Sequence, residues 1–316
     1  MAIAPLSNIN GSNPGLLHLL SKSNPSLPSI SLTHKPMRFK VTAMSQSKSH
    51  WASINEDLVT HLKHSIPIRP PLVVFEPMHH LTFAAPETTA PALCIAACEL
   101  VGGRREEAMA AASALHLIHA AYYAHEHLPL TDRARPKPKI NHAFGPNIEL
   151  LTGDGLVPFG FELLARSNDL TAQDNSDKIL RVITEIARAA GPQGVIDGQY
   201  CNFLYTQSNW KDSSQVEMIK RVSEKKEGEL HACAAACGAI VGGGSEEEIE
   251  KLRKYGLYVG MIKGMLYGIG RNYEKCLVKE EVDKLRTLAL NELRDFNNGV
   301  ELEAISSLVE AELCNA

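Results

Sequence analysis

Apolar residues recur at helical spacing through most of the chain from residue 52 onward. In the stretch 177–190 they lie three or four residues apart, which places Ile179, Val182 and Ile186 on one face of a helix. Gly191-Pro192 follows directly, and this pair is typical of a helix end. The alternation of apolar and polar residues that marks a strand is nearly absent. The pattern therefore predicts an all-α protein.

Local signals place the ends of several other helices. Pro91 is suited to a first helical turn, and Gly102-Gly103 closes the apolar run that follows it. Ser245 and Glu248 form a capping box before another apolar face. Alanine-rich residues 104–125 favour a helix, and residues 282–289 carry a further apolar face. The stretches 129–138 and 242–245 are predicted to be loops. No repeat of 20–50 residues is found, and we expect a single helical domain.

Composition excludes several classes of protein. The chain has 316 residues, of which 44% are hydrophobic, and a formal net charge of −4. A disordered chain would be poorer in apolar residues, and a nucleic-acid-binding protein would usually carry a basic face. No apolar run is long enough to span a membrane. The 7 cysteines do not suit a disulfide framework in a chain of this length. We therefore expect neither a nucleic-acid partner nor a membrane span.

The N-terminal segment differs from the rest of the chain. The first acidic residue of the chain is Glu56. The segment before it is rich in serine and contains scattered lysine and arginine. This is the composition of an organelle transit peptide, and it favours a plastid, in the stroma. An ordinary disordered N-terminus is the alternative. We expect residues 1–48 to be a disordered transit peptide, with processing near residues 41–43, and residues 49–316 to be the helical domain.

Two segments share a Cys-x(3)-Cys pattern, Cys94 with Cys98 and Cys233 with Cys237. Each pair lies on a single helical face with small residues between, which allows another helix to approach closely. Buried core cysteines and a helix–helix contact, within the chain or with a partner, are both consistent with this pattern. Zinc is a third alternative, although structural zinc ligands usually lie in loops with turn glycines.

A second cluster holds several histidines, followed by Asp132: His116, His119, His125 and His127, with Glu126. His125 and His127 do not have the spacing of a zinc-protease motif, because those histidines must lie four residues apart on one helical face. His116 and His119 are three residues apart and could share a face. Packed or hydrogen-bonded histidines are the simpler interpretation, and no metal is assigned to the chain.

The order of short motifs resembles a known family. The blocks are L-C-I-A-A-C-E-L-V-G-G, L-I-H, H-L-P, N-H-x-F-G, L-T-G-D-G-L, D-G-Q and G-A-I-V-G-G-G, in that order along the chain. Together they resemble plant trans-prenyltransferases of the geranylgeranyl diphosphate synthase type, from about residue 52 to the end. The resemblance implies an isoprenoid synthase-type helical bundle. It also implies chemistry in which Mg²⁺, held by carboxylates on two facing helices, neutralises a leaving diphosphate.

This sequence departs from the family at the residues that carry that chemistry. The first aspartate-rich motif falls on Glu126, His127 and Asp132, and only the last of these is an aspartate. The second falls on residues 263–271, where the aspartate positions hold Tyr267, Gly268 and Arg271. The resemblance therefore implies that metal-assisted ionisation is lost.

The diphosphate-binding positions have changed as well. A basic block of the family falls on residues 85–91, where Glu87, Thr88 and Ala90 stand without the basic residues. Lys226 and the pair Gly198-Gln199 still match family positions, as remnants of a pocket.

A family scaffold that lacks this chemistry and has two Cys-x(3)-Cys motifs resembles the small subunits of heteromeric geranyl diphosphate synthases. By this resemblance, Cys94, Cys98, Cys233 and Cys237 are assigned to partner binding. The partner would be a geranylgeranyl diphosphate synthase-like large subunit, in a heterodimer or heterotetramer, and it would hold the Mg²⁺. The chain itself would bind no cofactor and would be inactive alone. The complex would make geranyl diphosphate, the monoterpene precursor, from dimethylallyl and isopentenyl diphosphates.

Three alternatives remain open from the sequence. A small subunit of a second type would raise geranylgeranyl diphosphate output instead. A competent prenyltransferase would use a remodelled site with Glu126, Asp132 and Asp154. A structural or metal-binding helical protein would have no link to isoprenoids.

Overall fold

The computed structural model describes residues 37–128, 143–167, 173–207, 213–268, 275–296 and 299–314. These residues form helices and connecting turns, with no strand among them. The all-α prediction is therefore confirmed. The helices are α1 (Met37–Ser65), α2 (Leu72–Ala84), α3 (Ala90–Leu100), α4 (Arg105–His127), α5 (Pro146–Arg166), α6 (Gln173–Ala190), α7 (Val195–Gln207), α8 (Ser213–Ser223), the π-helix η1 (Glu224–Gly228), α9 (Glu229–Val241), α10 (Glu246–Tyr267), α11 (Lys275–Glu292) and α12 (Gly299–Cys314).

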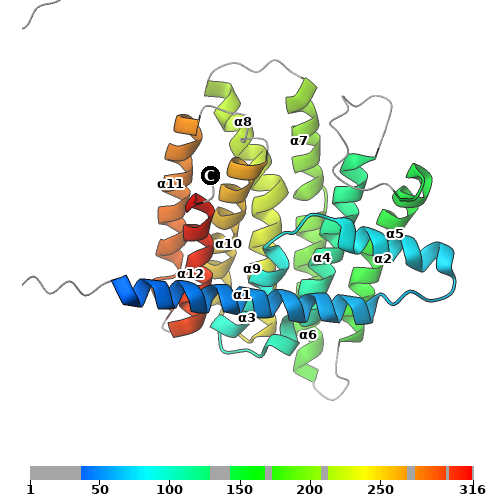
Figure 1. Ribbon diagram of the computed structural model, residues 1–316, viewed down its shortest axis with the longest axis horizontal. Helices are drawn as coiled ribbons and strands as arrows, with labels where there is room; N and C mark the ends of the chain where they lie inside the picture. Colours follow the sequence, from blue (N-terminus) through cyan, green and yellow to red (C-terminus); the bar gives the residue numbers. More distant parts are fainter. Residues whose placement is uncertain are drawn as a thin grey trace, which may run out of the picture.

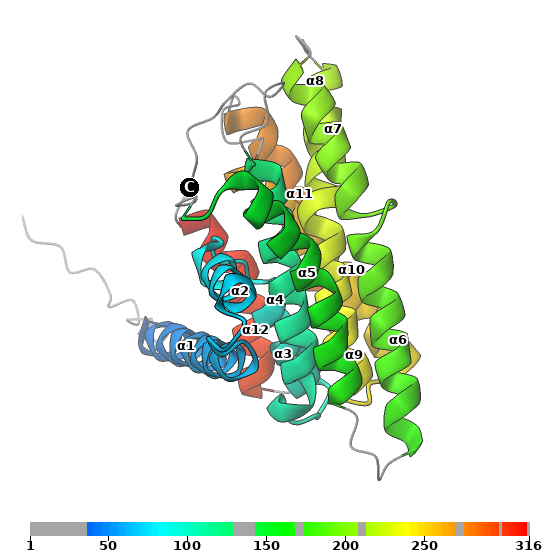
Figure 2. The same cartoon turned by 90° about the vertical axis from the view of Figure 1, so that its right-hand side faces the viewer.

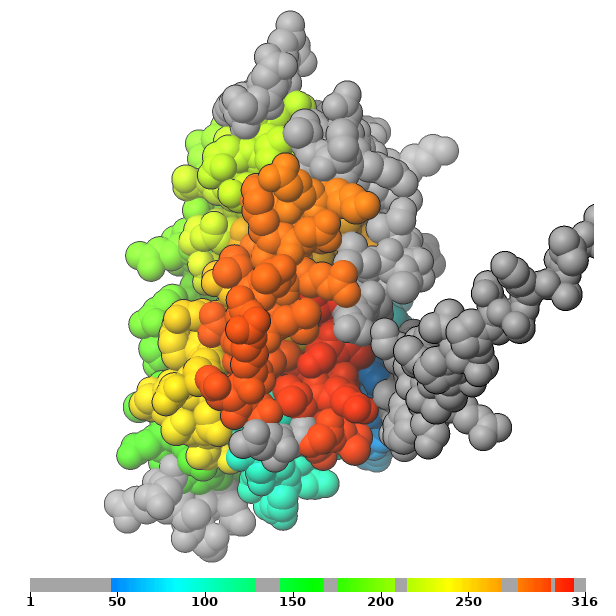
Figure 3. Space-filling model, turned by 90° about the vertical axis from the view of Figure 1, so that its left-hand side faces the viewer, coloured from blue at the N-terminus to red at the C-terminus, as the bar shows by residue number. Residues whose placement is uncertain are grey.

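Most of these helices form an upright bundle, and α1 lies across one side of its lower half (Figure 1 and Figure 2). Helices α3, α4, α9 and α10 pack against one another in the interior. Helices α5, α6 and α7 form one side of the bundle (Figure 2), and α11 and α12 lie side by side on another (Figure 3). None of the described helices has the length and apolar content needed to cross a membrane.

The interior helices approach one another closely because they present glycine and alanine. On α10, a Cβ added to Gly256 or Gly260 would collide with backbone carbonyl groups of His231 or Glu227. A Cβ on Gly264 would lie 2.8 Å from the Cβ of Ser223. Helix α10 therefore lies directly against the continuous segment formed by α8, η1 and α9. This contact sets the position of the η1 side chains described below.

The helix ends follow the local signals of the sequence. Pro91 lies in the first turn of α3, and Gly102 follows that helix with a positive φ of 90°. The capping box before α10 is present, with the backbone N–H of Glu248 donating to Ser245 Oγ at 3.3 Å. Helix α6 ends at Ala190, and residues 242–245 form the turn between α9 and α10. The predicted loop at 129–138 lies outside the described residues.

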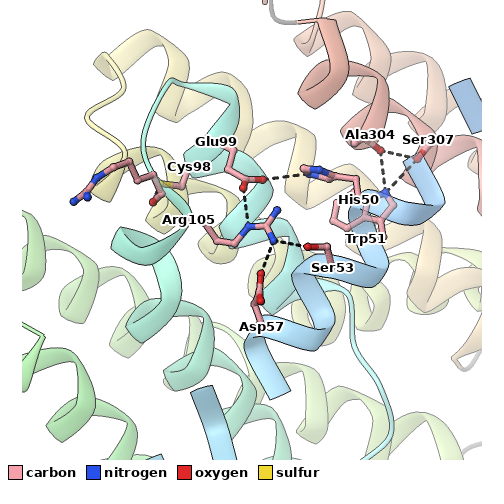
Figure 4. A network of polar contacts seen from close by, with 10 residues as sticks. His50, Trp51, Ser53, Asp57, Cys98, Glu99, Arg105, Ala304 and Ser307 are labelled. Carbon is pink, nitrogen blue, oxygen red and sulfur yellow. Dashed lines mark hydrogen bonds and ion pairs between the residues drawn. The ribbon is translucent and has the colours of Figure 1, made fainter. Parts of the chain in front are cut away.

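A network of polar contacts fixes the first helix to the bundle (Figure 4). Arg105 of α4 donates to Glu99 of α3 at 2.8 Å and to Asp57 of α1 at 2.6 Å. Trp51 Nε1 donates to the carbonyl oxygen of Ala304 in α12 at 3.2 Å. Helix α1 continues through the expected boundary between residues 48 and 49, and Ser47 is already buried against α12. The boundary itself stays a prediction.

Candidate functional site

A cavity of about 330 Å³ opens between the α2–α3 connection, α4, α7, η1 and the end of α10. Its walls are lined by the residues Pro86, Glu87, Thr88, His119, Tyr122, Tyr123, Glu126, His127, Val195, Gln199, Asn202, Lys226, Glu227, Leu230, Lys263, Gly264, Tyr267 and Gly268. The cavity is therefore formed where the last turns of α4 and α10 face η1, and it contains both acidic and basic side chains.

Glu126, in the last turn of α4, is held by groups from two other helices. Lys226 Nζ lies 2.7 Å and 2.9 Å from its two carboxylate oxygens, and Asn202 Nδ2 donates to Oε1 at 3.0 Å. Burial of Glu126 favours its neutral form, but the charge and hydrogen bonds of Lys226 outweigh burial and lower the pKa of the carboxyl. Glu126 is therefore an ionised carboxylate already paired within the chain.

His127, the next residue of the first aspartate-rich motif, also makes its contacts within the chain. The ring of His127 stacks on Tyr123 with a centroid separation of 4.0 Å. His127 Nδ1 lies 2.8 Å from the carbonyl oxygen of Tyr123, which can only accept, so this nitrogen carries the hydrogen.

A chain of hydrogen bonds also lies beside the cavity, and it links Glu227, His231, Thr89 and Lys263. His231 Nδ1 donates to the carbonyl oxygen of Glu227 at 2.7 Å. Burial lowers the pKa of His231 to about 3, so its Nε2 is a neutral acceptor, and the Thr89 hydroxyl donates to it at 3.0 Å. The Thr89 oxygen then accepts from Lys263 Nζ at 3.2 Å. This chain of bonds fixes the ammonium group of Lys263 at the cavity.

The structure brings most of the sequence-predicted positions together. Glu87, Thr88, Glu126, His127, Tyr267 and Gly268 all line the cavity, as do the remnants Gln199 and Lys226. Ala90 does not, because it is buried in the first turn of α3. Asp132 and Arg271 lie outside the described residues. Asp154 lies on α5, 3.5 Å from His125, and is not part of the cavity wall.

Sequence reasoning missed Asn202, Thr89 and His231. Asn202 lies one helical turn after the recognised Gln199 on α7, so helical spacing could have indicated it. His231 lies one turn after Glu227, which the sequence did not single out. Thr89 lies within the recognised block 85–91, but its contact was not indicated, because its partner His231 is 142 residues away.

The four cysteines of the two Cys-x(3)-Cys motifs are buried at the contact between α3 and α9, each with 2% of its surface exposed or less. Cys233 Sγ and Cys237 Sγ are 3.7 Å apart. Burial raises the pKa of Cys94 well above its usual range, and that of Cys98 to about 12. The motifs therefore pack against each other within the chain. Whether they contribute to partner binding stays a prediction, and any contribution would act through the placement of these helices.

Comparison with known proteins identifies the family. A family model described as polyprenyl synthetase matches residues 72–262, more than half of the chain. The chain belongs to this family, in agreement with the resemblance to trans-prenyltransferases. Family membership leaves no support for the alternative of a helical protein unrelated to isoprenoids.

The similar proteins include named subunits of heteromers. The chain is 50% identical over 281 residues to the chloroplastic heterodimeric geranylgeranyl pyrophosphate synthase small subunit 2 of Cannabis sativa, covering 87% of this chain and 97% of that one. It is 52% identical to the geranyl diphosphate synthase small subunit of Antirrhinum majus, with a TM-score of 0.75 over 84% of this chain and 98% of that one. A chain of a mint heterotetrameric geranyl pyrophosphate synthase (a deletion mutant) is also 52% identical, with a TM-score of 0.74 over 83% of this chain and 99% of that one. The isoprenoid synthase-type fold is thereby confirmed.

Proposed function

We propose that this chain is the non-catalytic small subunit of a heteromeric prenyl diphosphate synthase in the plastid stroma. Its partner is a geranylgeranyl diphosphate synthase-like large subunit, which holds Mg²⁺ and performs the transfer. The loss of catalysis is supported by the pairing of Glu126 with Lys226. It is also supported by Tyr267 and Gly268, which stand at the facing motif in place of carboxylates. Carboxylates on two facing helices are what the metal-assisted reaction requires.

The proposed product of the complex is geranyl diphosphate, as the likeness to the Antirrhinum majus subunit suggests. A second candidate is geranylgeranyl diphosphate, which the name of the Cannabis sativa relative favours. A subunit without chemistry changes product length only if it binds one state of its partner better than another. Faster product release or a narrower elongation cavity in the partner would favour the shorter product.

The side of the bundle formed by α5, α6 and α7 is suited to this partner (Figure 2). It exposes large apolar side chains, with Leu151 at 65%, Leu180 at 63% and Tyr200 at 61% of their surface. Burial of such residues is the usual source of stability in a lasting subunit interface. We propose that the large subunit covers this side.

The test of activity is expression of the chain alone and together with a large subunit, followed by product analysis from isopentenyl and dimethylallyl diphosphates. We expect no turnover by the chain alone and mainly ten-carbon product from the pair. Robust turnover by the isolated chain would contradict the loss of catalysis. A mainly twenty-carbon product would favour the second candidate.

The test of the interface is co-purification of variants with the large subunit. Leu180→Lys and Leu151→Lys should weaken the complex at least tenfold, because each would bury an unpaired charge. Leu288→Lys is the matched control, since Leu288 is 43% exposed on α11, at a different side of the bundle (Figure 3). If all three variants bind equally well, the partner does not cover α5, α6 and α7.

A further inference from the structure

The residues of the cavity do not fit the metal that the family implies. Mg²⁺ prefers oxygen ligands and usually binds through one or two carboxylates together with substrate phosphates. Both oxygens of Glu126 instead face Lys226 Nζ, and one of them also accepts from Asn202. Within the described part of the chain, no group of three or more His, Cys, Asp or Glu side chains is arranged to hold a metal ion.

The position of Lys226 is set by the backbone around it. It lies in the π-helix η1, a wide turn of the kind often found at functional sites. A Cβ added to Gly198 of α7 would lie 2.7 Å from Lys226 Cγ and 2.8 Å from the Lys226 backbone nitrogen. The absence of a side chain at Gly198 therefore leaves the space through which the Lys226 stem reaches Glu126.

The surroundings favour a lasting pair over a loose surface contact. The side chains of Lys226 and Glu126 are 20% and 25% exposed. Attraction between opposite charges is stronger at such a partly shielded position than in open water. Removing one member would leave the other charge poorly solvated.

We propose that Lys226 is the built-in counter-ion of Glu126, at the place where a divalent cation would bind this carboxylate. The pair closes the cavity to divalent cations and joins the last turn of α4 to η1. The proposal concerns the chain itself and holds whichever product its complex makes.

The first experiment is a titration of the full chain with Mn²⁺, followed by electron paramagnetic resonance. We expect no saturable site at millimolar Mn²⁺ in the unaltered chain. A single site that Glu126→Gln weakens would overturn the proposal, because it would show that the carboxylate is available to a metal.

The second experiment is a double-mutant cycle in thermal unfolding of the full chain. Lys226→Met should lower the Tm by several degrees, because it leaves the Glu126 carboxylate unpaired. Lys226→Met combined with Glu126→Gln should restore most of that loss, since no unpaired charge remains. Lys225→Met is the matched control, because the neighbouring Lys225 pairs instead with Glu229 on the same helical segment, at 3.0 Å. It should change the Tm by less than Lys226→Met.

Glu126→Gln alone completes the cycle, and a loss in the double variant equal to the sum of the losses of Lys226→Met and Glu126→Gln would overturn the pairing. If Lys226→Met alone does not fold, recovery of folded protein in the double variant carries the same inference, and failure of the double variant overturns it.

Discussion

The carbonyl oxygen of Cys94 faces Gly238 so closely that a Cβ on that glycine would collide with it. Cys94 belongs to the first Cys-x(3)-Cys motif, and Gly238 directly follows the second, so the two motifs pack backbone to backbone where α3 meets α9. This close approach leaves little room for side chains, so small residues such as cysteine and alanine are required at the contact.

The first prediction concerns this contact. Gly238→Ala should lower the free energy of unfolding by about 2 kcal/mol or more, because the methyl group forces the two helices apart. Urea unfolding measures the change. Gly155→Ala is the control, since a Cβ at Gly155 meets nothing within 4 Å. That substitution in α5 should leave stability unchanged or raise it by up to about 1 kcal/mol. An equal loss in both variants would mean that the α3–α9 contact does not require glycine.

The second prediction concerns the cysteines themselves. All four thiols are buried, and the pKa values of Cys94, Cys98 and Cys237 are raised. Cys94, Cys98, Cys233 and Cys237 should therefore resist alkylation in the folded chain and react after unfolding. Peptide mass spectrometry after brief treatment with iodoacetamide measures this site by site. Rapid labelling of any of the four at neutral pH would contradict the buried contact.

The role of these cysteines in partner binding can be separated from their packing. Replacing Cys94 and Cys98 together by serine should weaken co-purification with the large subunit and should also lower the Tm, because two hydroxyls enter the core. Replacement of the same two by alanine removes the thiols without burying hydroxyls. If the alanine variant binds the partner normally, the thiols act only through packing. If the serine variant also binds normally, these cysteines are core residues without influence on the partner.

Whether a contact could be predicted from the sequence depends on how far apart its two residues lie along the chain. Ser245 and Glu248 are three residues apart, and their capping box was predictable because both members belong to one helical turn. The pairing of Glu126 with Lys226 spans 100 residues. Each residue was recognised, but their contact depends on the packing of α4 against η1 and on the space at Gly198. No local pattern in the sequence indicates such packing. The sequence therefore indicated that the metal ligands had been lost, but it did not indicate that Lys226 lies beside Glu126.

The fourth prediction is a loss of stability at acidic pH that depends on His231. The unfolded chain protonates this imidazole below about pH 6.5, whereas in the folded chain burial lowers its pKa to about 3. Above about pH 6.5 the His231 imidazole is neutral in both the folded and the unfolded chain, so it does not change the free energy of unfolding with pH there. As the pH falls from there toward 3, the free energy of unfolding should fall by up to about 1.4 kcal/mol per pH unit from this residue.

Urea unfolding at pH 7.5, 6 and 5 measures that dependence. His231→Gln should be less stable at pH 7.5, because the bond to Thr89 is disturbed, but its stability should fall less steeply with pH. His64→Gln is the control, since His64 is exposed and bonds only to the backbone of its own helix. Glu227, His119 and Lys263 lie around His231 and are unchanged in the comparison. Parallel pH profiles for the unaltered chain and His231→Gln would contradict the prediction.

The last prediction concerns the N-terminal limit of the folded domain. The described tertiary contacts of α1 begin at Ser47, which lies 2.5 Å from Ser307, and continue with His50 on Glu99 and Trp51 on Ala304. Deletion of residues 2–46 leaves all of these contacts, whereas deletion of residues 2–51 removes them. The longer deletion should therefore lower the free energy of unfolding by roughly 2–4 kcal/mol relative to the shorter one. Urea unfolding of the two truncated chains measures the difference. Equal stabilities would mean that residues 47–51 are dispensable and that processing after residue 51 would leave an intact domain, whereas the expected loss would show that residues 47–51 contribute to the folded domain and that such processing would weaken it.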